Sequence, residues 1–453
     1  MTPGRFASIS TLAGSLCFLI GCASPQADAR KISADLERRS GYTLTNSKPG
    51  EIVLPASVSF DDGLSEDEAV TVALWNNAAF QETLADLGLS RADLVQAGML
   101  PNPTLSMLFP IGAKPFELTA RYPLEAFWLR PRRVAAAKLD YERTAQRLVQ
   151  SGLDLIRDVR LACADLGLAN QRLSLAETTE KLDRAIAEQA QARLRAGEAS
   201  ELEAASANID TLQAKEQLAR ATHEASAFRE RLRALIGLSV DRRSIALHES
   251  PLPNDFPRDS SVLVTDALAA RPDLRAAELG LEAAGKRIGL AKAEIYTFTI
   301  ALNAKEVGAD FLAGPGLDIP IPIFNQNQGG IAQASAKFEK AARQYITVRD
   351  RIVLEVREAH TRLAQAQESH EQWQKHILPP LEESARLAEK SYAAGNVTYL
   401  FVLETERKLS DARLKAATAA ADVRRARAEL ERSVGRRLDG KNDNQSKNET
   451  DAR

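Results

Sequence analysis

The chain has 453 residues, with 59 Lys or Arg against 61 Asp or Glu, so its formal net charge is −2. Hydrophobic residues make up 44% and charged residues 26%, which supplies a folded core and excludes a mainly disordered chain. Aromatic residues are only 5%, and long tracts of Ala, Leu, Glu, Arg and Gln favour extended helices over an all-β fold. The balanced charge argues against nucleic acid as a partner.

The N-terminus predicts an export signal. A basic residue precedes the apolar run Phe6–Ile20, which is too short for a membrane-spanning helix. The run leads into Leu19-Ile20-Gly21-Cys22, which resembles the lipobox of bacterial lipoproteins, whose cysteine is acylated. We therefore expect residues 1–21 to be a lipoprotein signal peptide and Cys22 to carry the lipid. The alternative is an ordinary signal peptide with an incidental cysteine.

Residues 22–61 are polar and contain several prolines, so we expect a periplasmic tether. A helix is predicted to follow, from Ser65 to about Gln96, because Ser65 with the acidic residues after it is typical of a helix N-cap. Alternating apolar and polar residues within 104–122 then predict two short strands.

A very long helix is predicted next. The tract from Arg132 to Arg195 contains no proline and few glycines, which indicates one helix ~95 Å long. A turn at Gly197 leads to a shorter predicted helix, Ser200–Leu235. Together, the helix before the strands and the helix after the turn match the long helix in length. Each such unit is therefore expected to be two helices wide.

The whole pattern occurs twice. Gly197 stands 40 residues before Gly237, and Gly395 stands 40 residues before Gly435. A repeat of this size indicates duplication of a whole module rather than a solenoid. The strands of the second copy are expected at about 297–323. The expected organisation is a first repeat, a linker, a second repeat and a disordered tail, at residues 62–239, 240–260, 261–437 and 438–453.

Both strand pairs are expected to be short. Pro110 and Pro115 limit each strand of the first pair, and Gly314-Pro315-Gly316 is expected to shorten the second pair. Strands of about seven residues, tilted near 40°, rise only ~18 Å, whereas the apolar band of a membrane barrel is ~25 Å. The lipid on Cys22 is therefore expected to be a main membrane attachment.

One copy of the chain is too thin to enclose a core. Four strands are fewer than the eight of the smallest closed membrane barrel, and open strand edges are not tolerated in lipid. Three copies would supply twelve strands and a ring of helices. We therefore expect a mainly α fold with a small β part: a long α-helical barrel and a short antiparallel β-barrel, both closed only in a homotrimer.

Four short motifs accompany the duplication: Leu100-Pro101-Asn102-Pro103-Thr104-Leu105, Arg271-Pro272-Asp273-Leu274, Pro322-Ile323-Phe324-Asn325 and Ala394-Gly395. With the repeat, they resemble the TolC-like outer-membrane efflux family, in its lipid-anchored branch, over roughly residues 62–437. The resemblance implies a channel-tunnel in the cell outer membrane that extends into the periplasm. It also implies a passive exit duct of a tripartite efflux or secretion system, which docks a periplasmic adaptor protein and an inner-membrane transporter.

The alternative to a duct is a non-conducting, lipid-anchored periplasmic scaffold with a truncated β-barrel. The transported substrate and the class of pump cannot be read from the sequence, since selectivity in the family lies largely with the pump. In either case the resemblance places the contact with the adaptor at the helix-turn tips, marked here by Gly197 and Gly395.

The resemblance also implies a gate at these tips. In the family a tyrosine, here Tyr392, can hydrogen-bond an acidic residue six places after the first turn glycine, here Glu203. Two carboxylates three residues apart often ring the closed aperture, and here those positions are Phe401 and Glu404. A mixed apolar and acidic constriction is therefore expected in place of an acidic double ring. The alternative is that Glu404 belongs to a solvated helix face.

No residue pattern indicates an enzyme, a cofactor or a resident metal. The three histidines His360, His370 and His376 are spaced by ten and six residues, which does not place them on one helix face. Cys163 lies among leucines and has no histidine near it in sequence, which favours a packed residue over a nucleophile. There is no phosphate-binding loop and no dinucleotide fingerprint.

Overall fold

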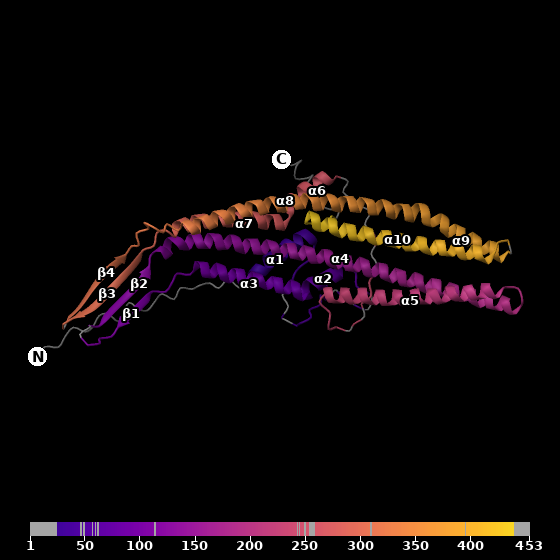
Figure 1. Cartoon of the computed structure of the whole chain (residues 1–453), viewed down its shortest axis with the longest axis horizontal. Coiled ribbons are helices and arrows are strands. Elements are labelled where there is room, and N and C mark those ends of the chain that lie inside the picture. Colours follow the sequence, from indigo (N-terminus) through magenta and orange to yellow (C-terminus); the bar gives the residue numbers. More distant parts are fainter. Residues whose placement is uncertain are drawn as a thin grey trace.

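The computed structural model describes residues 25–438 except 46–47, 49, 57, 59, 61–62, 113–114, 242, 244, 249–250, 253–258, 309 and 395. The expected signal peptide, Cys22, Gly395 and residues 439–453 lie outside the described residues. The molecule is elongated, with a small sheet at one end and paired helices at the other (Figure 1). Among the described residues, no helix is both long and apolar enough to cross a membrane.

The structure is mainly helical with one small antiparallel sheet. The first half contains α1 (Pro25–Ser40), α2 (Glu66–Asn76), α3 (Ala78–Gly98), β1 (Thr104–Leu108), β2 (Glu117–Pro123), α4 (Glu125–Arg195) and α5 (Glu201–Leu235). The second half contains α6 (Ser260–Ala270), α7 (Pro272–Ala293), β3 (Thr299–Val307), β4 (Asp310–Asp318), α8 (Gln328–Glu371), the π-helix η1 (Gln372–Ile377), α9 (Leu378–Ala393) and α10 (Tyr399–Val434).

The 71-residue helix α4 is the longest element of the first half, and the other helices of this half pack along it. The helices α3 and α5 follow one another along α4, as the predicted lengths required (Figure 1). In the second half, α7 and α10 lie in the same way along α8 and α9. The junction of α8 and α9 is the π-helix η1, because Pro379 and Pro380 at the start of α9 lack the N–H groups that a regular α-helix needs.

The first predicted helix is two helices in the structure. Ser65 forms the expected capping box with Glu68 and starts α2. Asn77 then ends α2 and starts α3, since its backbone is extended and its side chain accepts a hydrogen bond from the Phe80 N–H. The sequence did not reveal this break, because the helical pattern of apolar residues continues across it.

The sheet has the order β1-β2-β3-β4, and all three pairings are antiparallel. The expectation that Gly314-Pro315-Gly316 shortens the second strand pair was wrong, since β4 runs through it for nine residues and Pro315 pairs with Leu302. Proline is tolerated here because β4 lies at an edge of the sheet within the chain. The first pair is short as expected, with five residues in β1 and seven in β2.

Part of the expected tether is folded against the helices. Ile32 and Leu36 of α1 are buried, and Leu36 packs so closely on Gly152 of α4 that a Cβ there would lie 3.1 Å from its Cδ1. The linker is anchored too, since Ile245 is buried and Leu247 bridges to Leu64. The sequences of these two segments are polar overall, because only isolated apolar side chains anchor them to the rest of the molecule.

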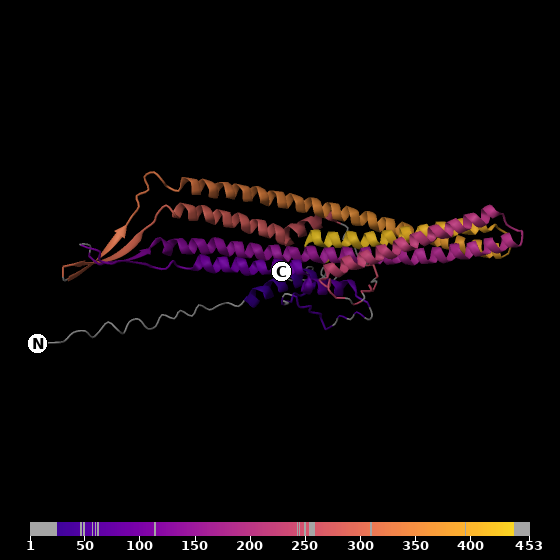
Figure 2. The ribbon, with the colours of Figure 1, turned by 60° about the horizontal axis from the view of Figure 1, so that its bottom comes forward.

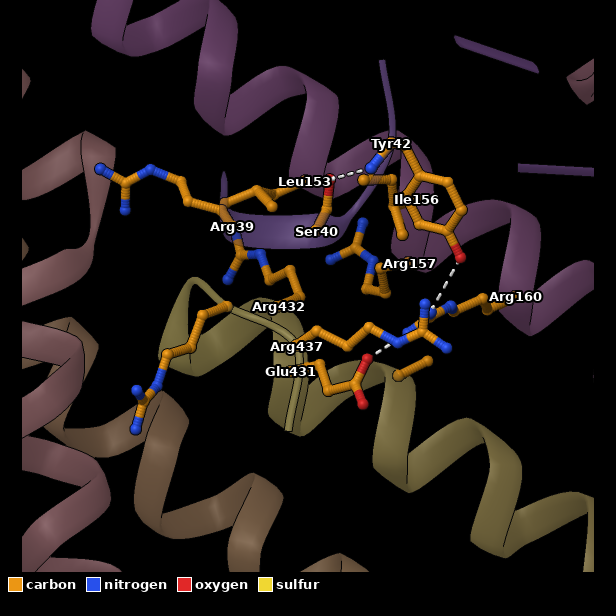
Figure 3. Close-up of a pocket in the computed structure, with 12 residues that line it drawn as sticks. Arg39, Ser40, Tyr42, Leu153, Ile156, Arg157, Arg160, Glu431, Arg432 and Arg437 are labelled. Carbon is orange, nitrogen blue, oxygen red and sulfur yellow. Dashed lines mark hydrogen bonds and ion pairs between the residues drawn. The ribbon is translucent and has the colours of Figure 1, made fainter. Parts of the chain in front are cut away.

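Buried charged side chains connect α4 with α10 and with the segment after α1, near the middle of the long axis of the molecule (Figure 3). Arg160 of α4 pairs with Glu431 of α10, and its Nε lies 3.0 Å from Glu66 at the start of α2. The guanidinium also donates to the Tyr42 hydroxyl, just after α1, at 3.2 Å. Burial alone lowers the pKa of Arg160, but the negative neighbours outweigh it and raise that pKa above its usual range.

Candidate functional site

The two helical turns expected to form the periplasmic tips lie together at the end of the molecule opposite the sheet (Figure 1). The turn between α4 and α5 contains Gly197, whose φ of 75° lies in the left-handed region that favours glycine. A Cβ there would meet no atom within 4 Å, so the backbone angle rather than crowding accounts for the glycine.

Glu203 lies in the first turn of α5 and has a partner in its own hairpin. The Arg193 Nη1, near the end of α4, lies 3.2 Å from its Oε1, and Ser200 caps the helix by accepting from the Glu203 N–H. Both charged side chains are about half exposed, so this pair contributes at most ~1 kcal/mol. Arg193 was missed at the sequence level because it stands ten residues before its partner, across the turn.

Tyr392 is partly buried near the end of α9. Its expected hydrogen bond to Glu203 stays a prediction. The carboxylate of Glu203 therefore has two candidate partners, Arg193 within one hairpin and Tyr392 from the other. A carboxylate that can accept from either of two donors suits a contact between the hairpins that forms when the tip is closed and breaks when it opens.

Phe401 and Glu404 stand one turn apart on the exposed face of α10. Phe401 is 52% exposed, whereas Val402, Leu403 and Thr405 on the other side of the helix are buried. Both candidate gate side chains therefore point away from the core of their own chain. They are free to face a channel or a second copy of the chain.

Contacts just beyond the tips hold α10 against α4 and α5. Leu403 is buried in a small apolar cluster with Ile186, Ala190 and Ala207. One turn further along α10, Arg407 forms an ion pair of 3.1 Å with Asp210 of α5. These contacts could not be predicted from the sequence, because they join segments about 200 residues apart.

Asp183 of α4 is buried beside this ion pair. Burial raises the pKa of its carboxyl, the positive charge of Arg407 opposes that shift, and Asp210 adds to it. A carboxyl whose pKa is raised on folding stabilises the folded chain most when it is protonated, and this contribution is lost as the pH rises through its folded-state pKa. Mild acid therefore does not weaken the packing at Asp183.

Among the described residues, the other candidates from the sequence, the histidines and Cys163, do not form a metal site or a reactive group. No three His, Cys, Asp or Glu side chains come together as a metal site in the part of the chain that the structure describes. His370 lies on α8, where burial and then Arg424 lower its pKa. Cys163 is buried in α4, and burial raises the pKa of its thiol well above the usual range, which keeps it protonated and unreactive.

A model of one protein family, described as outer membrane efflux protein, matches residues 69–238 and again residues 263–436. The cobalt-zinc-cadmium resistance protein CzcC of Cupriavidus metallidurans is 25% identical over 404 residues, which cover 87% of this chain and 96% of that protein. The cation efflux system protein CusC of Escherichia coli strain K12 is 31% identical over 161 residues, 32% of this chain and 35% of that protein.

Solved structures show the same fold. The open-state outer membrane channel MtrE of Neisseria gonorrhoeae superposes with a TM-score of 0.65 at 19% identity, and the match covers 86% of this chain and 98% of that one. A crystal structure of CusC superposes with a TM-score of 0.67 at 19% identity, over 86% of this chain and 98% of that one.

Proposed function

The chain belongs to the outer membrane efflux protein family, and we propose that three copies form the outer-membrane exit duct of a tripartite efflux or secretion system. Membership of this family gives transport rather than catalysis as the activity, and the outer membrane as the location. The molecule suits a duct, because its sheet and its helical tips lie at opposite ends (Figure 1). The helical end would reach through the periplasm to an adaptor protein and an inner-membrane transporter.

The observation that carries the homotrimer is the open sheet. Among the described residues β1 and β4 each pair with a strand on one side only, which leaves each with one unpaired strand edge in this part of the chain. Such edges are costly in lipid, so β4 of one copy would pair with β1 of the next. Three copies would close a barrel of twelve strands. The match of the family model to two separate stretches supports the proposed duplication, with repeats at 62–239 and 261–437.

The proposed cargo is a transition-metal cation, because relatives that match this chain are named for cobalt, zinc, cadmium and cation efflux. The described residues assemble no metal-binding group, so the duct would pass ions without holding them and the transporter would select them. Deleting the gene for this chain should therefore lower the tolerance of its host to zinc, cobalt or cadmium several-fold. Growth in graded metal concentrations, with a plasmid copy as the control, measures this. Unchanged tolerance to all three metals would remove the cation proposal.

Cys22 is proposed to carry a lipid that shares the membrane attachment with the strands. Five residues in β1 rise only ~13 Å after tilt, and nine residues in β4 rise ~23 Å, against an apolar band of ~25 Å. Cys22→Ser should therefore release much of the protein from the outer-membrane fraction. Cys17→Ser, within the expected signal peptide, is the matched control and should release none. A Cys22→Ser protein that stays quantitatively embedded would show that the strands suffice.

A further inference from the structure

A small cavity lies where three helices meet near the middle of the long axis. Figure 2 shows α1 and the C-terminal end of α10 meeting α4 there. Half of the 12 residues that line the cavity are arginines (Figure 3). These six are Arg39, Arg157, Arg160, Arg432, Arg436 and Arg437. The described wall contains one acidic side chain, Glu431, so the permanent positive charges of the arginines dominate it.

Carboxylates outside the wall hold these arginines in place. Arg157 donates to one oxygen of Asp158 through Nε at 2.9 Å and Nη2 at 2.7 Å. Arg432 bridges Asp154 and Glu355, at 2.7 Å from each. These ion pairs offset the repulsion between neighbouring guanidinium groups and fix their positions. The wall is therefore formed before any ligand enters the cavity.

The side-chain acceptors of the wall are already occupied. Glu431 accepts from Arg160 at Oε2 and from Arg427, at 3.0 Å, at Oε1. The Tyr42 hydroxyl accepts from Arg160 at 3.2 Å, and the Ser40 Oγ accepts from the Tyr42 N–H at 3.4 Å. A ligand in the cavity therefore finds each of these acceptors with a donor already bound.

Donors of the wall, in contrast, remain available. The Nε of Arg436 is buried and has no hydrogen-bond partner among the described residues, although its Nη2 lies 2.6 Å from Asp266. Arg157 binds Asp158 through Nε and Nη2, which leaves the N–H groups of its Nη1. A buried donor without an acceptor is costly. The cavity therefore suits a ligand that supplies acceptors.

A small anion meets this need better than water does. A water molecule brings two donors of its own, whereas an anion brings acceptors only and forms the stronger, charge-assisted hydrogen bonds with guanidinium groups. The cavity has a volume of about 20 Å³, and one water-sized particle needs ~10–15 Å³. It therefore admits a monatomic ion and excludes a nucleotide or a phospholipid headgroup.

We propose that this cavity binds one small inorganic anion, with chloride as the occupant. The site lies within a single chain, so it depends on neither the proposed duct nor the homotrimer. Arg39 comes from α1, Arg157 from α4, and Arg436 from the residues just after α10. The anion would therefore tie the N-terminal segment and the end of α10 to α4. It would enter beside Arg436 and Arg437, whose side chains are 42% and 34% exposed.

Thermal unfolding of the full-length protein in two sodium salts tests the proposal. Chloride replaces gluconate at constant ionic strength, so general screening of charges stays the same. The melting temperature should rise by several degrees, because a ligand that binds only the folded chain stabilises it, and gluconate is too large for the cavity. Equal melting temperatures in the two salts would overturn the site.

Arg157→Gln combined with Arg436→Gln should abolish the response to chloride. The two side chains are 24% and 42% exposed, so the double variant is expected to fold. The matched control is Arg425→Gln, because Arg425 joins α10 to Asp165 of α4 at 2.6 Å but lies outside the wall. It should keep the wild-type response. A double variant that responds to chloride as the wild type does would overturn the assignment of the anion to this cavity.

Bromide in crystals of the wild-type protein gives a readout that needs no variant to fold. When bromide replaces chloride, an anomalous-scattering peak should appear in the cavity beside Arg157 and Arg436. Water alone at this position would overturn the proposal, whatever the two salts do to the melting temperature.

Discussion

Glu203→Gln combined with Tyr392→Phe should raise the conductance of the proposed trimer in planar bilayers several-fold. The double variant removes the carboxylate acceptor and the hydroxyl donor of the expected latch between the two hairpins. Each such bond contributes on the order of 1 kcal/mol, and a trimer holds three of them. Loss of all three would shift a closed tip towards its open state by more than a factor of ten. Cells that carry the variant should also become sensitive to large antibiotics such as vancomycin.

Arg193→Gln is the control that the structure supplies. It removes the ion pair within the first hairpin but leaves the Glu203 carboxylate free for Tyr392. If the carboxylate is a latch, Arg193→Gln leaves the conductance low. Equal effects of Arg193→Gln and Glu203→Gln would show that Glu203 only closes its own hairpin. Wild-type and variant trimers that never conduct would favour the scaffold over the duct.

A second set of contacts lies next to the expected Glu203–Tyr392 hydrogen bond and limits how far the double variant opens the channel. Leu403 stays buried against Ile186 and Ala190, and Arg407 stays paired with Asp210. Opening is therefore expected at the tips, with α10 still attached to α4 and α5 beyond them. The conductance should rise without loss of the trimer.

The long helices and the sheet could be predicted because their signals are local. The proline-free tract predicted α4 from Arg132 onward, but the helix begins at Glu125 and continues through Pro131, so its start was missed. Period-two alternation predicted β2, because successive side chains of a strand point to opposite faces. The folded part of the expected tether could not be predicted in this way. Among the described side chains of α1, the buried apolar ones are Ile32 and Leu36, which stand isolated in a polar stretch that packs on α4.

The candidate site divides in the same manner. Gly197 marks a turn in the sequence, and the family resemblance pointed to Phe401 and Glu404. The structure has Gly197 in the turn between α4 and α5 and the other two residues on the exposed side of α10. The pair of Arg407 with Asp210 joins two helices that only tertiary packing brings together. No spacing in one sequence reports it.

Glu431→Gln should produce the largest loss of stability among single substitutions of the charged residues around Arg160. Glu431 is 6% exposed and Arg160 8% exposed, and they face each other between α10 and α4 (Figure 3). Breaking a buried ion pair by neutralising one partner costs about 3 kcal/mol, because the other charge stays buried. Glu66 remains at 3.0 Å, but burial raises the pKa of its carboxyl against the pull of Arg160, so it compensates only in part.

Thermal unfolding followed by circular dichroism measures this loss as a fall of several degrees in the melting temperature. Glu429→Gln, two residues earlier on α10 and only partly buried, is the matched control and should change little. The double variant Arg160→Met with Glu431→Leu should regain most of the stability, since apolar side chains of similar size remove both buried charges. A Glu431→Gln protein as stable as wild type would show that water or Glu66 already neutralises Arg160. The N-terminal segment would then be held by the packing of Leu36 on Gly152 rather than by charge.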